Sequence, residues 1–79
     1  MKKSIYTTES DLLRKWLVDK RHKADLSQRQ LSSLLGIHHS IVGKIETGER
    51  QINVLELVQY CHVLKADPVE IIEQLKKLL

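Results

Sequence analysis

The stretch from Leu26 to Arg50, LSQRQLSSLLGIHHSIVGKIETGER, constrains the fold more than any other part of the chain. It contains two short helix-forming pieces separated by one glycine, Gly36. Ser27, with Gln30 three residues later, matches a capping box, in which two backbone N–H groups at a helix start are satisfied. Each piece is shorter than the roughly twelve residues that an isolated helix needs in water. The two pieces must therefore pack on each other and on the rest of the chain.

Helical patterns continue on both sides of this stretch. Apolar residues recur at helical spacing, first at Leu12, Leu13, Trp16 and Leu17, and later at Val54, Leu57, Val58, Cys61 and Leu64. Helix starts are marked by a second capping box, an Asp-Pro pair and an N-terminal threonine: Asn53 with Glu56, Asp67 with Pro68, and Thr7 or Thr8. These signals predict helices at about 9–23, 27–35, 38–47, 53–64 and 67–78. Because no segment alternates with period two, we expect an all-α fold, a compact five-helix bundle.

Length and composition limit the other possibilities. A chain of 79 residues is expected to form one domain, residues 1–79. A single cysteine, Cys61, forms no internal disulfide, and neither a cofactor nor a metal is indicated. The start turns polar too early for a signal peptide, and no apolar run approaches the ~20 residues of a membrane span. We therefore expect a cytoplasmic protein with no membrane partner and no small-molecule ligand.

The positive charge is concentrated in the first part of the chain. Residues 1–50 hold ten Lys and Arg against six Asp and Glu, whereas residues 51–79 hold three against four. This asymmetry favours a polyanionic partner for the first part, although many basic surfaces only keep a protein soluble.

The stretch from 27 to 47 matches a helix-turn-helix. Gly36 can adopt the left-handed conformation that ends one helix, and the small Ser32 lies where the two helices would cross. Apolar residues fall at core positions in register with both features: Leu31, Leu35, Ile37, Val42 and Ile45. In such a motif the second helix is presented to the major groove of DNA.

The chain resembles the phage repressor/Cro (XRE-type) helix-turn-helix family from about Ile5 to Ile72. The segments that carry the resemblance are LSQRQLSSLLGI, SIVGKIETGER and INVLELVQYCHVLKADP. The resemblance implies a lambda-repressor-like DNA-binding domain of bacterial or phage origin. It also implies a transcriptional regulator, usually a repressor, that binds palindromic double-stranded DNA as a homodimer. Three residues depart from the family pattern: Ser32, His38 and Gly43.

The resemblance makes the segment 38–47 the recognition helix. Its outward residues are expected to read bases: His39, Ser40, Gly43 and Lys44. Lys44 is the only fixed charge on that face, and lysine commonly contacts guanine O6 and N7. Residues at the flanks are expected to contact phosphates or the groove edge: Gln28, Arg29, His38, Thr47 and Arg50. For each flanking residue alone, an ordinary solvated side chain is an equally good interpretation.

His38 and His39 allow two interpretations. If an imidazolium lies beside a phosphate, DNA binding takes up a proton and tightens at lower pH. Alternatively, His38 caps the helix while neutral His39 hydrogen-bonds a base, and binding depends little on pH.

Glu46 is an acidic residue near the end of this helix, where the helix dipole disfavours it. The family resemblance implies that Glu46 forms a structural ion pair with Arg21 of the first helix and so holds the recognition helix in place.

The last helix carries more apolar surface than one contact with the core uses. We expect a homodimer interface formed by Ile72, Leu75, Leu78 and Leu79. Alternatively, this helix only closes the bundle. For function, the alternative to a DNA-binding regulator is a protein-interaction module or antitoxin-type partner on the same fold, with weak specific DNA binding. We expect no enzyme, because no carboxylate pair, phosphate loop or catalytic triad spacing is present.

Overall fold

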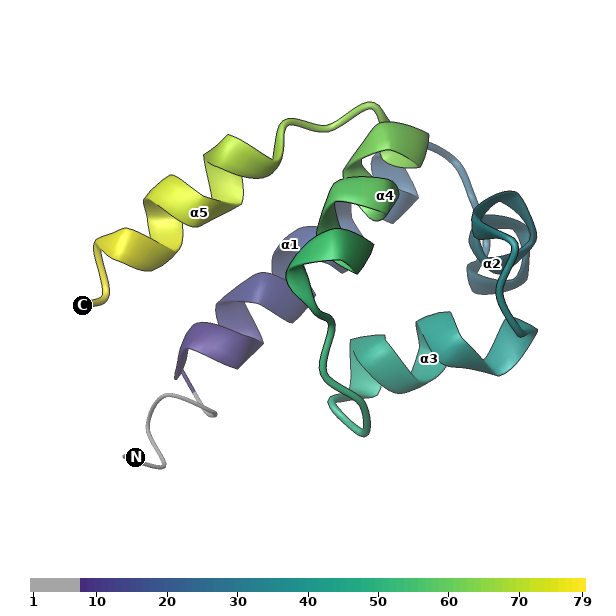
Figure 1. The fold of residues 1–79 in the computed structure, drawn as a ribbon, viewed down its shortest axis with the longest axis horizontal. Coiled ribbons are helices and arrows are strands. Elements are labelled where there is room, and N and C mark those ends of the chain that lie inside the picture. Colours follow the sequence, from purple (N-terminus) through teal and green to yellow (C-terminus); the bar gives the residue numbers. More distant parts are fainter. Residues whose placement is uncertain (1–7) are drawn as a thin grey trace.

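The computed structural model describes residues 8–79 and contains five helices connected by short loops (Figure 1). They are α1 (Ser10–Lys23), α2 (Gln28–Leu35), α3 (His39–Thr47), α4 (Val54–Leu64) and α5 (Pro68–Lys76). No strand occurs among the described residues, so the predicted all-α fold is confirmed.

Local hydrogen bonds explain where four of the helices begin. Both expected capping boxes are present: Ser27 accepts from the backbone N–H of Gln30 at the start of α2, and Asn53 accepts from that of Glu56 at the start of α4. At α5, the Asp67 side chain accepts from the N–H of Val69, and a proline occupies the first turn. At α3, the His38 side chain accepts from the N–H of Ser40. Residues 27, 38, 53 and 67, predicted as helix starts, are thus the N-caps.

The first helix differs from its prediction. Its N-cap position is Glu9, which makes no side-chain capping hydrogen bond, so Thr8 does not cap α1. Thr7 lies outside the described residues. At the other end of the chain, α5 ends at Lys76, two residues before the predicted end.

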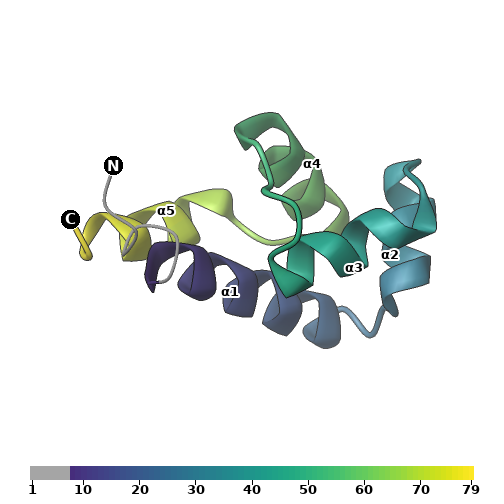
Figure 2. The same ribbon diagram turned by 90° about the horizontal axis from the view of Figure 1, so that it is seen from below.

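Side chains from all five helices form one core. Leu17 of α1, Leu31 of α2, Val42 of α3, Tyr60 of α4 and Ile71 of α5 are each at most 2% exposed. Figure 2 shows α1 and α5 lying along one side, with α4 above them and the α2–α3 pair at the far end. Helix α3 packs against both α1 and α2. The helix-turn-helix is therefore supported by the longest helix of the bundle.

The apolar stripe predicted for α4 is partly wrong. Val54 and Val58 are 73% and 51% exposed, whereas Tyr60, which was not in the predicted stripe, is buried. The buried face is Leu57, Tyr60, Cys61 and Leu64, which is also an i, i+3, i+4, i+7 series. In a helix as apolar as this one, two such series coexist, and contacts with the other helices decide which one is buried.

Polar contacts attach α5 to α1. The indole Nε1 of Trp16 donates to Glu70 Oε2 at 3.1 Å, and Lys20 Nζ lies 3.4 Å from Glu70 Oε1. The Trp16 hydrogen bond lowers the pKa of the Glu70 carboxyl, with Lys20 acting in the same direction. Cys61 is a buried thiol whose pKa is raised by burial, as expected for a residue that serves as a small hydrophobe.

Candidate nucleic-acid interface

The turn between α2 and α3 is built on Gly36. This residue has φ 70° and ψ 30°, the left-handed conformation that favours glycine, and the N–H of Ile37 reaches back to the Ser32 carbonyl at 3.0 Å. Ser32 is fully buried, and its hydroxyl donates to the carbonyl of His39 at 3.3 Å. A larger residue at 32 would push the two helices apart. These contacts set the angle at which α3 leaves α2.

His38 caps α3 with its ring. Its Nδ1 accepts from the backbone N–H of Ser40 at 3.2 Å and lies 2.8 Å from the Ser40 hydroxyl. Because a backbone N–H can only donate, Nδ1 carries no proton in this arrangement. The ring of His39 lies against that of His38, with centroids 4.3 Å apart. His38 therefore caps α3 in the free protein, whereas the role of His39 at DNA stays a prediction.

The outward face of α3 contains most of the predicted base-reading residues. Lys44, His39 and Thr47 are exposed, while Ser40 and Gly43 are half-buried. The Thr47 hydroxyl donates to the Lys44 carbonyl at 3.2 Å and is thus occupied within the helix. Two side chains, Lys44 and His39, are left with their polar ends exposed on this face.

Arg21, Glu46 and Gln28 form one network behind this face. Arg21 Nε and Nη2 donate to Glu46 Oε2 and Oε1 at 2.7 and 3.0 Å, and Arg21 Nη1 donates to the Leu26 carbonyl at 2.8 Å. Gln28 Nε2 also donates to Glu46 Oε1, at 2.8 Å. The carboxylate thus connects α3 to α1 and α2 together. The Arg21 and Glu46 side chains are only 10% and 5% exposed, so each charge depends on the other.

Arg50 is held by α4. Its Nη1 and Nη2 lie 3.1 and 2.6 Å from Glu56 Oε1 and Oε2, and Nη1 also donates to the Gln51 carbonyl. The guanidinium lowers the pKa of the Glu56 carboxyl. Arg29, by contrast, is an exposed side chain on the first turn of α2. Of the two arginines expected at phosphates, Arg50 also has a structural contact.

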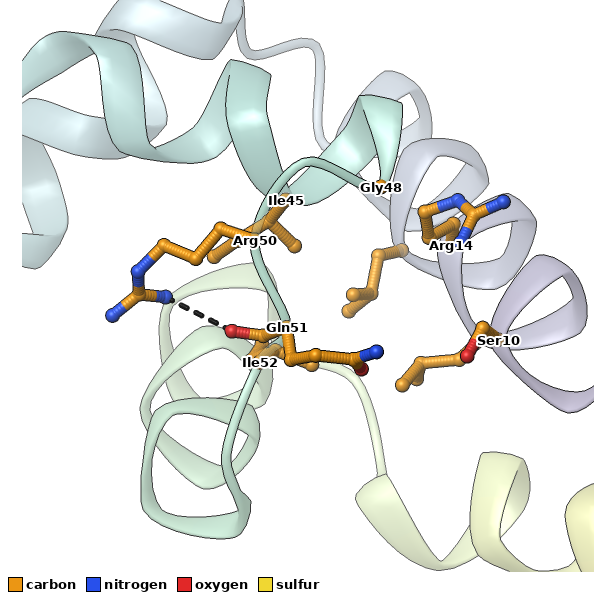
Figure 3. Close-up of a pocket in the computed structure, with 9 residues that line it drawn as sticks. Ser10, Arg14, Ile45, Gly48, Arg50, Gln51 and Ile52 are labelled. Atoms are coloured by element: carbon orange, nitrogen blue, oxygen red, sulfur yellow. Dashed lines mark hydrogen bonds between the residues drawn. The ribbon is translucent and has the colours of Figure 1, made fainter. Parts of the chain in front are cut away.

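Arg14 is a contact to α3 that sequence reasoning missed. A Cβ added at Gly48, the left-handed cap of α3 with φ 87°, would lie 3.1 Å from Arg14 Nη1. Figure 3 shows Arg14 and Ser10 on one side of a small cavity, with Gly48 and Gln51 on the other. The cavity measures about 20 Å³, room for roughly one water molecule. It is too small for an organic ligand.

Metal binding and membrane insertion have no support in the described residues. Residues 8–79 contain no cluster of three or more His, Cys, Asp or Glu side chains that could hold a metal ion. None of the described helices is both long enough and apolar enough to span a membrane.

Apolar side chains are exposed on two surfaces away from α3. On the last segment, Ile72, Leu78 and Leu79 are 45%, 43% and 93% exposed, while Leu75 is half-buried and packs against the core. A second surface, which the sequence analysis missed, lies over α2 and α4 and comprises Leu34, Val54, Leu55 and Val58. Two of these residues, Leu34 and Val58, line a shallow groove of about 460 Å³ between these two helices. This surface could not be predicted from the sequence, because Val54 and Val58 had been assigned to the buried stripe of α4.

Two helices joined at a left-handed glycine, with the second supported from behind and polar on its outer face, define a helix-turn-helix domain of the DNA-binding class. Comparison with known proteins gives the family. Residues 17–71 match the family model HTH_3, described as helix-turn-helix. The fold is similar to that of an XRE-family like protein from Pseudomonas syringae pv. tomato str. DC3000. That protein is 29% identical, with a TM-score of 0.86 over 96% of this chain and 93% of the other. No curated protein sequence matches.

This chain belongs to the XRE-type helix-turn-helix family. The resemblance noted in the sequence is therefore confirmed. The family fold is that of a DNA-binding regulator.

Proposed function

We propose that the protein is a transcriptional repressor that binds a palindromic operator as a homodimer, in the cytoplasm of a bacterium and without catalytic activity. The observation that carries this proposal is the mounting of α3. Its inner side is fixed by the buried Arg21–Glu46 pair, and its outer side exposes Lys44 and His39. A recognition helix has to be rigid at its back and polar at its front, because base contacts require donors and acceptors held in register with base edges.

The roles of individual residues follow from their surroundings. Lys44 has an exposed ammonium group suited to guanine O6 and N7, and His39 has an exposed ring. Arg29 supplies a positive charge at the N-terminus of α2, where backbone N–H groups also favour a phosphate. Arg50 keeps its contact with Glu56 and adds positive charge near the end of α3.

Selection of bound sequences from random double-stranded DNA tests the proposal. A dimer with two recognition helices selects a palindrome whose half-site centres are about 10–10.5 bp apart. Lys44→Ala should then change which bases are preferred and weaken binding to the best site by about 1–3 kcal/mol. Arg29→Ala should instead weaken all sequences similarly and reduce the salt dependence by about one unit of slope. Identical behaviour of both variants on selected and random DNA would show that α3 does not read bases.

The homodimer is proposed to form through the exposed residues of the last segment, Ile72, Leu78 and Leu79, with Leu75 at the edge of the core. Apolar patches left on a small protein are typical of association surfaces. Sedimentation at micromolar protein concentration tests this directly, both with and without DNA.

A second candidate function is favoured by the other apolar surface. This surface comprises exposed apolar side chains outside the last helix: Leu34, Val54, Leu55 and Val58. It could bind a protein partner, as in an antitoxin-type protein. In that case, specific DNA selection is weak, and Val58→Lys abolishes partner binding while DNA binding is retained. A strongly selected operator favours the repressor.

A further inference from the structure

Gln28 occupies the first position of α2, and its side chain crosses to α3. Its amide nitrogen Nε2 donates to Glu46 Oε1 at 2.8 Å. The same carboxylate accepts two hydrogen bonds from Arg21, which hold it in place. The end of the Gln28 side chain is therefore fixed by a group that is itself fixed.

This contact determines which way the Gln28 amide faces. An ionised carboxylate can only accept, so the NH₂ group must face Glu46 and the carbonyl oxygen Oε1 must face the other way. Oε1 lies beside Gly43 of α3: a Cβ added at Gly43 would be 3.1 Å from Oε1 and 3.8 Å from Cδ. The oxygen thus lies close to the backbone of Gly43, and a side chain at residue 43 would collide with it.

We infer that Gln28 reads a base edge, as an acceptor, and that Gly43 and Glu46 are positioning residues for it. The inference rests on the proposed DNA-binding function and assigns one contact within it. Gln28 is exposed, and its oxygen lies beside the half-buried Gly43, on the helix that is predicted to read bases. Phosphate oxygens only accept, so this oxygen has no partner on the DNA backbone. In the major groove its partners are the exocyclic amino groups of adenine (N6) and cytosine (N4).

The inference changes two expectations from the sequence. Gln28 was expected to contact a phosphate or the groove edge, and Gly43 was expected to be one of the base-reading residues. In the inferred arrangement, Gly43 contributes by having no side chain, and the group that reads the base belongs to Gln28 of α2. The second N–H of Gln28 Nε2 is still free to donate to a phosphate, so phosphate binding is the competing outcome that an experiment must separate.

Binding selection with Gln28→Met separates base reading from phosphate binding. Methionine keeps the length of the side chain but removes both the acceptor and the donors. At one position of each half-site, wild type should prefer adenine or cytosine over guanine or thymine on the contacted strand. In Gln28→Met, the ratio of affinities for the preferred and the disfavoured bases should fall by about two- to tenfold, the range for one neutral hydrogen bond. Gln59→Met, the same change at an exposed position on α4, should retain it.

Two results of this selection overturn the inference. If Gln28→Met weakens all sequences by the same factor, Gln28 holds a phosphate. If selection is unchanged, Gln28 contacts no DNA group that matters. A wild type that selects no sequence at all refutes the proposed function itself, and the inference falls with it.

The geometry is tested separately, without DNA, by NMR of the Gln28 side-chain amide. In wild type this signal should differ from that of a free glutamine, and Glu46→Gln and Gly43→Ala should both shift it. On DNA, Gly43→Ala should reduce the same base preference, because its methyl displaces the oxygen, and should have no further effect in Gln28→Met. If Gly43→Ala changes base preference equally in both backgrounds, the methyl acts directly on DNA and Gly43 does not position Gln28.

Discussion

Removing Glu46 should destabilise the domain more than removing any exposed carboxylate. The Glu46 side chain is 5% exposed and receives three hydrogen bonds, two from Arg21 and one from Gln28. In Glu46→Ala the Arg21 guanidinium, 10% exposed, keeps its hydrogen bond to the Leu26 carbonyl and its 3.4 Å contact with His22 Nε2, but it loses its counter-charge. Loss of one partner from a buried pair costs about 3–5 kcal/mol.

This cost is large relative to the stability of so small a domain. With about 0.05–0.15 kcal/mol per residue, the total free energy of unfolding is roughly 4–12 kcal/mol. Because 1 kcal/mol corresponds to about 4–8 °C in Tm for a domain of 60–100 residues, Glu46→Ala should lower Tm by at least ~12 °C. Circular dichroism during thermal and urea unfolding measures both quantities.

An exposed pair provides the matched control. Asp19 and Lys23 are joined at 3.1 Å, but their side chains are 55% and 68% exposed. Asp19→Ala should therefore change the free energy of unfolding by less than about 0.5 kcal/mol. Arg21→Ala should cost as much as Glu46→Ala, and the double variant should cost far less than the sum. Additive losses in this cycle would refute the coupling, and a loss equal to that of the control would refute the magnitude.

The other predictions concern acid stability, the two glycine caps and self-association. Arg50 lowers the pKa of Glu56 below its ordinary 4.5, so their contact contributes stability above about pH 4.5 that is lost as pH falls through the lower folded-state pKa. Glu56→Gln should thus destabilise at pH 7 and flatten the acid dependence in urea unfolding; an unchanged acid dependence contradicts the assignment. Gly36→Ala, with nothing within 4 Å of the added Cβ, should cost only the left-handed strain of about 1–2 kcal/mol, and Gly48→Ala more, because its Cβ meets a guanidinium. Equal losses of Tm would contradict that order. Ile72→Lys should produce a monomer in sedimentation with Tm nearly unchanged, whereas a retained dimer places the interface elsewhere.

Helix starts and the turn could be predicted because they depend on residues only a few positions apart. A capping box is completed within four residues, as at Ser27 and Asn53, and the left-handed turn at Gly36 needs only the glycine. The start of α1 could not be predicted in this way, because its N-cap, Glu9, makes no side-chain hydrogen bond; Thr8 is not the cap, and Thr7 lies outside the described residues. The family resemblance supplied the pairing of Arg21 with Glu46, which local reasoning does not provide.

Contacts between residues distant in sequence were decided by the tertiary structure. In α4, Tyr60 faces the core, whereas Val54 and Val58 are exposed. The positions of the neighbouring helices decide this, and the apolar pattern of α4 alone does not predict them. The orientation of the Gln28 amide likewise follows from a carboxylate 18 residues away. Sequence periodicity shows that a helix has an apolar face and where its ends are capped. Which of two apolar faces is buried, and which polar atom is turned outward, depends on neighbours that only folding brings within hydrogen-bonding or van der Waals distance.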